Sequence, residues 1–203
     1  MFEASVTNYR LDRSSTSDSD SLILYYSPTR FVKMTQEPQY YRVSRVWFGM
    51  SGNLRDPHVP DSPQFHHAIF VQKDGSGSGD VHHAIGDVTN PHGMRYEKKF
   101  RDSIFQSSTY HHEQLLGYIK ASSYLQLHAV LQSCQTPPRQ KAYNATRDAT
   151  EPFKTANPFT FYTTDELKYF QFPRLRKCKW WVEDQAIPAL QASGLLVPQP
   201  PAN

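Results

Sequence analysis

Apolar and polar positions alternate, or gather in short runs, at several places along the chain. Strands are predicted at residues 21–26, 41–48, 93–100 and 114–120, where such runs end at Gly, Pro or other turn-forming residues. The polar start of the chain predicts a flexible segment over residues 1–21, and the proline-rich end predicts a disordered tail over residues 198–203. A single domain is therefore expected over residues 22–197.

The stretch Phe65–Val88 consists of two apolar runs that flank KDGSGSG, which predicts a β-hairpin. Gly75, Gly77 and Gly79 are expected to supply the positive φ angles of the reversing loop. Each arm carries two adjacent histidines, so four of the nine histidines in the chain fall on this one element. The hairpin is therefore expected to lie at the centre of the sheet and to form part of a functional site.

Side chains of successive strand residues point to opposite faces of a sheet, and this separates the histidines of each pair. His66 and Phe70 share one face of the first arm, whereas His67 lies on the other and more apolar face. We therefore expect His67 to be packed and His66 to border a cleft. The loop length does not specify the register of the arms, so either His82 or His83 can lie across from His66.

Helical patterns follow the strands. A stripe of apolar residues predicts a helix that begins near Ser123 and ends before the next proline pair: Leu127, Val130, Leu131 and Cys134. Residues 139–162 show little regular pattern and are expected to form a long loop. The spacing of Thr163 and Glu166 predicts a capping box at the start of a short helix. A last helix is expected over Cys178–Ser193, with Pro188 kinking or shortening it and Gly194 ending it.

Composition and charge argue against several classes of protein. The net charge is only +3 and the basic residues are scattered, which argues against a nucleic-acid-binding protein. No stretch approaches the roughly 20 apolar residues of a membrane span, and no signal peptide is apparent. With only two cysteines, free thiols in a reducing compartment are expected. The chain is therefore expected to be cytoplasmic and to act on a small-molecule substrate, and its oligomeric state stays open.

Cys178 is the predicted nucleophile. A thiol at a helix N-terminus, next to cations such as Lys177 and Lys179, is expected to ionise easily. With His66 as the base and His83 orienting it, the three residues would form a catalytic triad. Alternatively, Cys178 is a packed apolar residue and the histidines satisfy hydrogen bonds in the core.

Further residues are assigned to the predicted site or excluded from it. Substrate contacts are expected from aromatic side chains and one histidine: Trp47, Phe70, His82 and Trp181. The histidines do not predict a metal site, because adjacent histidines in a strand point in opposite directions and the sequence has no zinc-ligand spacing. No metal and no cofactor are therefore expected.

Three short motifs carry a resemblance to known proteins. The order HxAIFV, VHHAIG and then CxWWV resembles the circularly permuted papain-like group, which includes the NlpC/P60-like and lecithin:retinol acyltransferase-like proteins. Lys177 stands where that group often has Asn, and the gap before Cys178 is long. From Tyr41 onward the chain also resembles fungal proteins of about this length. The resemblance to the papain-like group implies an acyltransferase or hydrolase. The fungal resemblance implies a common fold and no particular activity, and a place in secondary metabolism is an expectation by analogy alone.

The patterns and the resemblance together predict an α+β fold, with an antiparallel sheet centred on the hairpin, packed helices and a permuted papain-like arrangement. The predicted function is acyl transfer, or amide or ester hydrolysis, through a thioester on Cys178. The first alternative is a tailoring enzyme, a cyclase or lyase, that uses histidine acid–base catalysis without a covalent intermediate. The second alternative is a non-catalytic binding protein with a decayed site.

Overall fold

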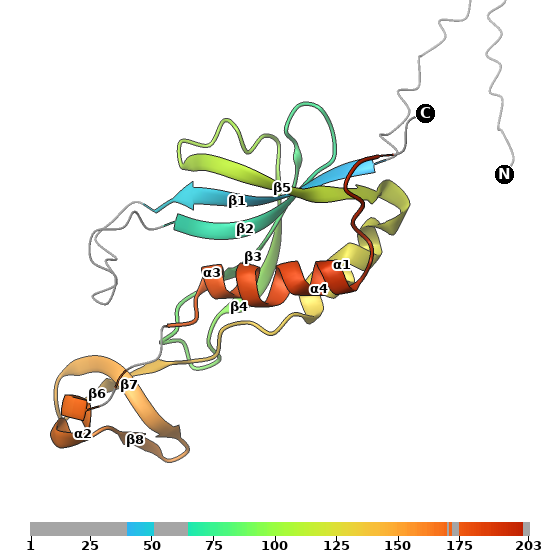
Figure 1. The fold of residues 1–203 in the computed structure, drawn as a ribbon. Helices are drawn as coiled ribbons and strands as arrows, with labels where there is room; N and C mark the ends of the chain where they lie inside the picture. The colour runs from blue at the N-terminus through green and yellow to red at the C-terminus, as the bar shows by residue number, and fades with distance from the viewer. Residues whose placement is uncertain (1–39, 51–64, 170, 172–174, 201–203) are drawn as a thin grey trace, which may run out of the picture. The chain divides into compact units, whose positions relative to one another are not determined.

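A five-stranded antiparallel sheet forms the centre of the fold. The computed structural model describes residues 40–50, 65–169, 171 and 175–200, so the predicted strand at 21–26 and most of the expected terminal segments lie outside the described residues. In spatial order the strands are β4 Arg95–Arg101, β3 Gly79–Ile85, β2 Phe65–Gln72, β1 Tyr40–Gly49 and β5 Tyr110–Lys120. The predicted α+β class with an antiparallel sheet is confirmed (Figure 1).

The predicted hairpin is formed by β2 and β3, which lie within the sheet. Of its three loop glycines only Gly77 has a positive φ, so the expectation for Gly75 and Gly79 was wrong. At Gly79 the constraint is close approach instead, because a Cβ there would lie 2.1 Å from the carbonyl oxygen of Val71. The Asp74 carboxylate organises the loop by accepting hydrogen bonds from residues 76 and 78.

The strand register gives the sheet two distinct faces. On the helix face, odd-numbered residues of β1 and β2 such as Val43 and Ile69 join a core with the helices. On the opposite face, called the open face below, Val46, Phe70 and Val81 form a smaller core. The β4–β5 connection at residues 102–109 contributes Ile104 to this smaller core. The alternation of side chains in β2 therefore decides which residues can meet.

Two helical segments cover the helix face (Figure 1). The first is α1, Tyr124–Ser133, which follows a 3₁₀ turn at Ala121–Ser123 and ends before the proline pair as predicted. The second runs without interruption through α3 Cys178–Trp180, a π-helical segment Trp181–Ala186 and α4 Ile187–Ala192.

Pro188 neither ends nor shortens the second helical segment. It lies in the first turn of α4, and the hydrogen-bond pattern changes from π to α just before it, so the helical hydrogen bonding shifts at the proline while the segment continues. Gly194, with φ of 66°, follows the last turn and ends the segment as predicted.

The expected long loop at 139–162 was wrong, because this region forms a three-stranded antiparallel meander. Its strands are β6 Lys141–Asn144, β7 Ala149–Ala156 and β8 Phe159–Phe161. Pro152 lies inside β7, and a proline within a run normally argues against a strand. The helix α2, Thr164–Tyr169, follows, and the predicted capping box is confirmed: Thr163 and Glu166 exchange backbone-to-side-chain hydrogen bonds.

Candidate active site

The predicted site residues are divided between the two faces of the sheet. His66 and His83 lie on the open face, together with the fully buried Phe70. Cys178 lies on the helix face, where it packs in the main core with Ile69 and its neighbours. The structure therefore brings the two predicted histidines together and separates both from the predicted nucleophile.

The environment of Cys178 differs from that of an activated thiol. Its side chain is 8% exposed, and burial raises the pKa of the thiol, although backbone N–H groups of His67 and Lys179 partly oppose that effect. Among the described residues, no hydrogen bond joins its sulfur to an imidazole ring. The expected Cys178–His66 pair is thus not formed, because the helix packs on the face of β2 to which His67, not His66, points.

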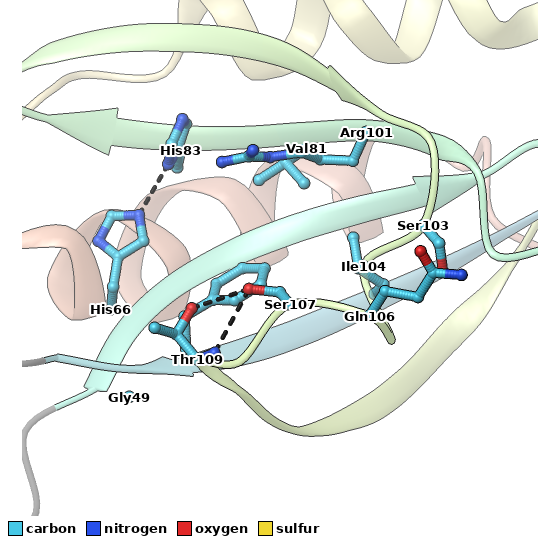
Figure 2. A pocket seen from close by; sticks show the side chains of 11 residues that line it. Gly49, His66, Val81, His83, Arg101, Ser103, Ile104, Gln106, Ser107 and Thr109 are labelled. Carbon is cyan, nitrogen blue, oxygen red and sulfur yellow. Dashed lines mark hydrogen bonds between the residues drawn. The ribbon is translucent and has the colours of Figure 1, made fainter.

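A cavity of about 440 Å³ lies on the open face (Figure 2). Its walls come from β1, β2, β3, the end of β4 and the β4–β5 connection, as follows: Phe48, Gly49, His66, Val81, His83, Arg101, Ser103, Ile104, Gln106, Ser107 and Thr109. The connection is held over the sheet by a hydrogen bond from the Ile104 N–H to the Gly77 carbonyl. The expectation that His66 borders a cleft agrees with this geometry.

Three side chains form a hydrogen-bonded chain that ends in this cavity. Nε2 of His66 lies 2.7 Å from Nδ1 of His83, and Nε2 of His83 lies 3.3 Å from a carboxylate oxygen of Glu97 (Figure 2 shows the first contact). Since a carboxylate only accepts, His83 donates its Nε2–H to Glu97 and accepts at Nδ1. His66 then donates from Nε2, which leaves Nδ1 of His66 with the basic lone pair.

Both histidines of this hydrogen-bonded chain, His66 and His83, are neutral at neutral pH. Burial, followed by the nearby His83, lowers the pKa of His66 to about 4. Burial also lowers the pKa of His83, and Glu97 opposes that effect through its hydrogen bond and charge. At neutral pH the lone pair on Nδ1 of His66 is therefore unprotonated, and the burial that keeps it so also makes His66 a weaker base than a free imidazole. Glu97 is placed to stabilise positive charge on the two imidazoles when His66 takes up a proton.

None of the residues predicted to bind substrate lines the cavity. His82 is fully buried on the helix face, where its ring nitrogens lie 2.6 Å from the Tyr96 hydroxyl and 3.4 Å from the Tyr124 hydroxyl. Trp181 is also fully buried and packs against Tyr96. Trp47 stacks on a histidine of β5, with ring centroids 4.0 Å apart. These residues hold the fold together rather than facing the cavity.

Glu97, Arg101 and the polar residues of the β4–β5 connection are functional candidates that the sequence pattern did not predict. The strand at 93–100 was predicted, and the alternation of its side chains separates its charged residues into two faces. In the β3–β4 ladder His83 pairs with Glu97 and Gly79 with Arg101, so both charged residues share the face of His83. Glu97, Lys99 and Arg101 are spaced two residues apart, so they lie on one face of the strand, and this spacing was the signal available in the sequence.

Among the described residues, no group of three or more His, Cys, Asp and Glu side chains is arranged to hold a metal ion. In the same part of the chain, no helix is long and apolar enough to cross a membrane.

Comparison with known proteins places the chain in a family. No curated protein and no solved structure matches it. A family model described as a family of unknown function, DUF6540, matches residues 56–197, which include the hairpin, all of the residues that carry the hydrogen-bonded chain and the terminal helix. The match covers well over half of the sequence, and the chain therefore belongs to the DUF6540 family.

Proposed function

We propose that the protein is a small-molecule enzyme that works by general acid–base catalysis without a covalent intermediate, in the manner of a cyclase or lyase. The observation that carries this proposal is the chain from Glu97 through His83 to His66, which ends in the cavity on the open face. A neutral imidazole at the edge of a cavity, backed by a second imidazole and a carboxylate, is a typical positioned base.

In the proposed reaction, Nδ1 of His66 removes a proton from the bound substrate. The Nε2–H of His66 then donates more strongly to His83, and the Nε2–H of His83 to Glu97, so that the new positive charge is stabilised by the carboxylate. The proton returns from His66 to another atom of the substrate, or to water, to complete the turnover. His66 is the catalytic residue of this scheme, and His83 and Glu97 are positioning residues.

Acyl transfer through Cys178 has less support. A nucleophilic cysteine needs a base within hydrogen-bond reach and a lowered pKa, whereas Cys178 is buried with a raised pKa. The permuted papain-like resemblance rests on the chain order of His66, His83 and Cys178, whereas the fungal resemblance extends over the sequence from Tyr41 onward and implies no particular reaction. The other alternative is a protein that binds a small molecule in the cavity and catalyses no reaction.

A chromogenic carbon acid tests the base without knowledge of the natural substrate. In the ring opening of 5-nitrobenzisoxazole, a base takes the C–H proton, the C–H electrons form a nitrile, and the N–O bond breaks to release a coloured phenolate. We expect the full-length protein to catalyse this reaction, and the rate to fall by about tenfold or more in His66→Gln. The Cys178→Ser variant is expected to keep the wild-type rate.

Controls separate the proposal from its rivals. His111→Gln removes an exposed histidine of β5 and should leave the rate unchanged. The wild-type rate should rise with pH around the pKa of His66, about 4, and stay level above about pH 6. Equal rates in the wild type and His66→Gln, or none above background, would contradict the proposal. A Cys178-dependent burst with 4-nitrophenyl acetate would support acyl transfer instead.

A further inference from the structure

The open face of β4 presents a row of charged side chains next to the cavity. In the ladder with β3, Gly79 pairs with Arg101, Val81 with Lys99 and His83 with Glu97. Paired residues of an antiparallel ladder point to the same face, so Lys99 and Arg101 lie on the side of the cavity. Lys98 pairs with His82 and therefore points to the helix face.

The charges of this row are not balanced. Glu97 is engaged by His83 and lies 3.7 Å from the guanidinium of Arg95. Lys99 and Arg101, in contrast, have no acidic partner within ion-pair distance among the described residues. Both cations act on His83, since each contributes to its lowered pKa. The wall of the cavity beside the histidine pair therefore carries uncompensated positive charge.

The remaining walls combine an apolar part and a hydrogen-bonding part. Val81 and Ile104 belong to the small core of the open face and offer apolar surface to the cavity. The β4–β5 connection adds Ser103, Gln106 and Ser107, whose hydroxyl and amide groups can donate to oxygen atoms. In Figure 2 the side chain of Arg101 runs from the end of β4 along Val81 toward His83.

We propose that the substrate is a small organic carboxylate, held by Arg101 with the charge of Lys99 behind it. The guanidinium of Arg101 matches a carboxylate in a bidentate manner, and a positive potential near the base also stabilises negative charge that develops when His66 removes a proton. The apolar body of the substrate lies on Val81 and Ile104. This inference rests on the proposed function, because it names the substrate class of the same cavity.

Matched probes test the charge requirement directly. Phenylacetate and phenylacetamide have nearly the same shape and differ in charge, and their dissociation constants can be measured by NMR titration of the full-length protein. We expect phenylacetate to bind about tenfold more tightly than the amide, and this preference to weaken as salt is added. Inorganic phosphate, added as a competitor, should displace phenylacetate only weakly.

Variants on the two faces of β4 locate the binding charge. Arg101→Gln should reduce phenylacetate binding about tenfold and leave phenylacetamide binding unchanged. Lys98→Gln makes the same change of charge on the same strand, but on the helix face, and should have little effect. Equal binding of the two probes, or equal loss in the two variants, would overturn the proposal. Tighter binding of phosphate than of phenylacetate would overturn the assignment to a carboxylate.

The binding test and the catalytic test fail separately. His66→Gln is expected to keep the preference for phenylacetate, because His66 carries no charge at neutral pH in this scheme. Loss of the anion preference together with His66-dependent ring opening would refute the substrate class alone. Preserved anion binding without His66-dependent ring opening would refute the proposed acid–base reaction.

Discussion

The buried histidine on the helix face makes a strong prediction about stability and pH. His82 is fully buried between β3, β4 and α1, with hydrogen bonds to Tyr96 and Tyr124. Burial lowers its pKa from 6.5 to about 3, although the charge of Asp80 opposes this effect and those of His128 and Lys98 add to it. The folded state therefore keeps His82 neutral at a pH where the unfolded chain is already protonated.

The sign and size of the effect follow from this difference. Because the folded pKa is lowered, the contribution is complete above pH 6.5 and is lost as the pH falls toward about 3. About pH 5 lies roughly 1.5 pH units below the pKa of histidine in the unfolded chain, and over this interval only the unfolded state takes up the proton. The stability lost is therefore about 2 kcal/mol. This is a large part of the roughly 5–15 kcal/mol that stabilises a typical domain.

Urea unfolding at about pH 7.5 and at about pH 5 measures this loss. In the wild type, His66 and His67 add to it, since burial lowers the pKa of each to about 4. In His82→Gln the loss between the two pH values should be smaller by about 2 kcal/mol, whatever the stability of the variant at pH 7.5. His111→Gln serves as an exposed control. An unchanged loss in His82→Gln would refute the reasoning.

Three further predictions concern backbone, core and site. Gly93→Ala should destabilise the protein by roughly 2 kcal/mol or more in thermal or urea unfolding. The reason is that φ of Gly93 is 71° and a Cβ there would lie 2.4 Å from the Pro137 carbonyl oxygen. Gly75→Ala is the control and should be nearly neutral, because a Cβ there would meet no atom within 4 Å. Leu131→Ala should cost about 2 to 5 kcal/mol by the same measurement, and Leu125→Ala, at a side chain 75% exposed, close to none. Glu97→Gln should slow the opening of 5-nitrobenzisoxazole about tenfold and shift the pH midpoint of the rate downward, because the carboxylate stabilises the protonated histidine pair. An unchanged rate and an unchanged midpoint would exclude a positioning role for Glu97.

Local pattern predicted the elements whose signals are local. The hairpin, the strand at 41–48, the helix after Ser123 and the capping box at Thr163 all depend on residues close together in sequence, and the structure has each of them. The meander at 139–162 was not predicted, because β6 and β8 are short and Pro152 lies inside β7, the longest of the three strands. Such strands are stabilised by pairing with one another, which a single segment does not reveal.

For the site, the sequence by itself determined that His66 and His67 point to opposite faces and that His67 lies on the more apolar one. Only the tertiary structure decided the rest. The register of β2 and β3 places His83, and not His82, beside His66, and the β3–β4 register adds Glu97. The face on which the terminal helix packs places Cys178 away from His66. The physical reason is that alternation is a property of one strand, whereas register and the choice of packed face arise from contacts between distant segments.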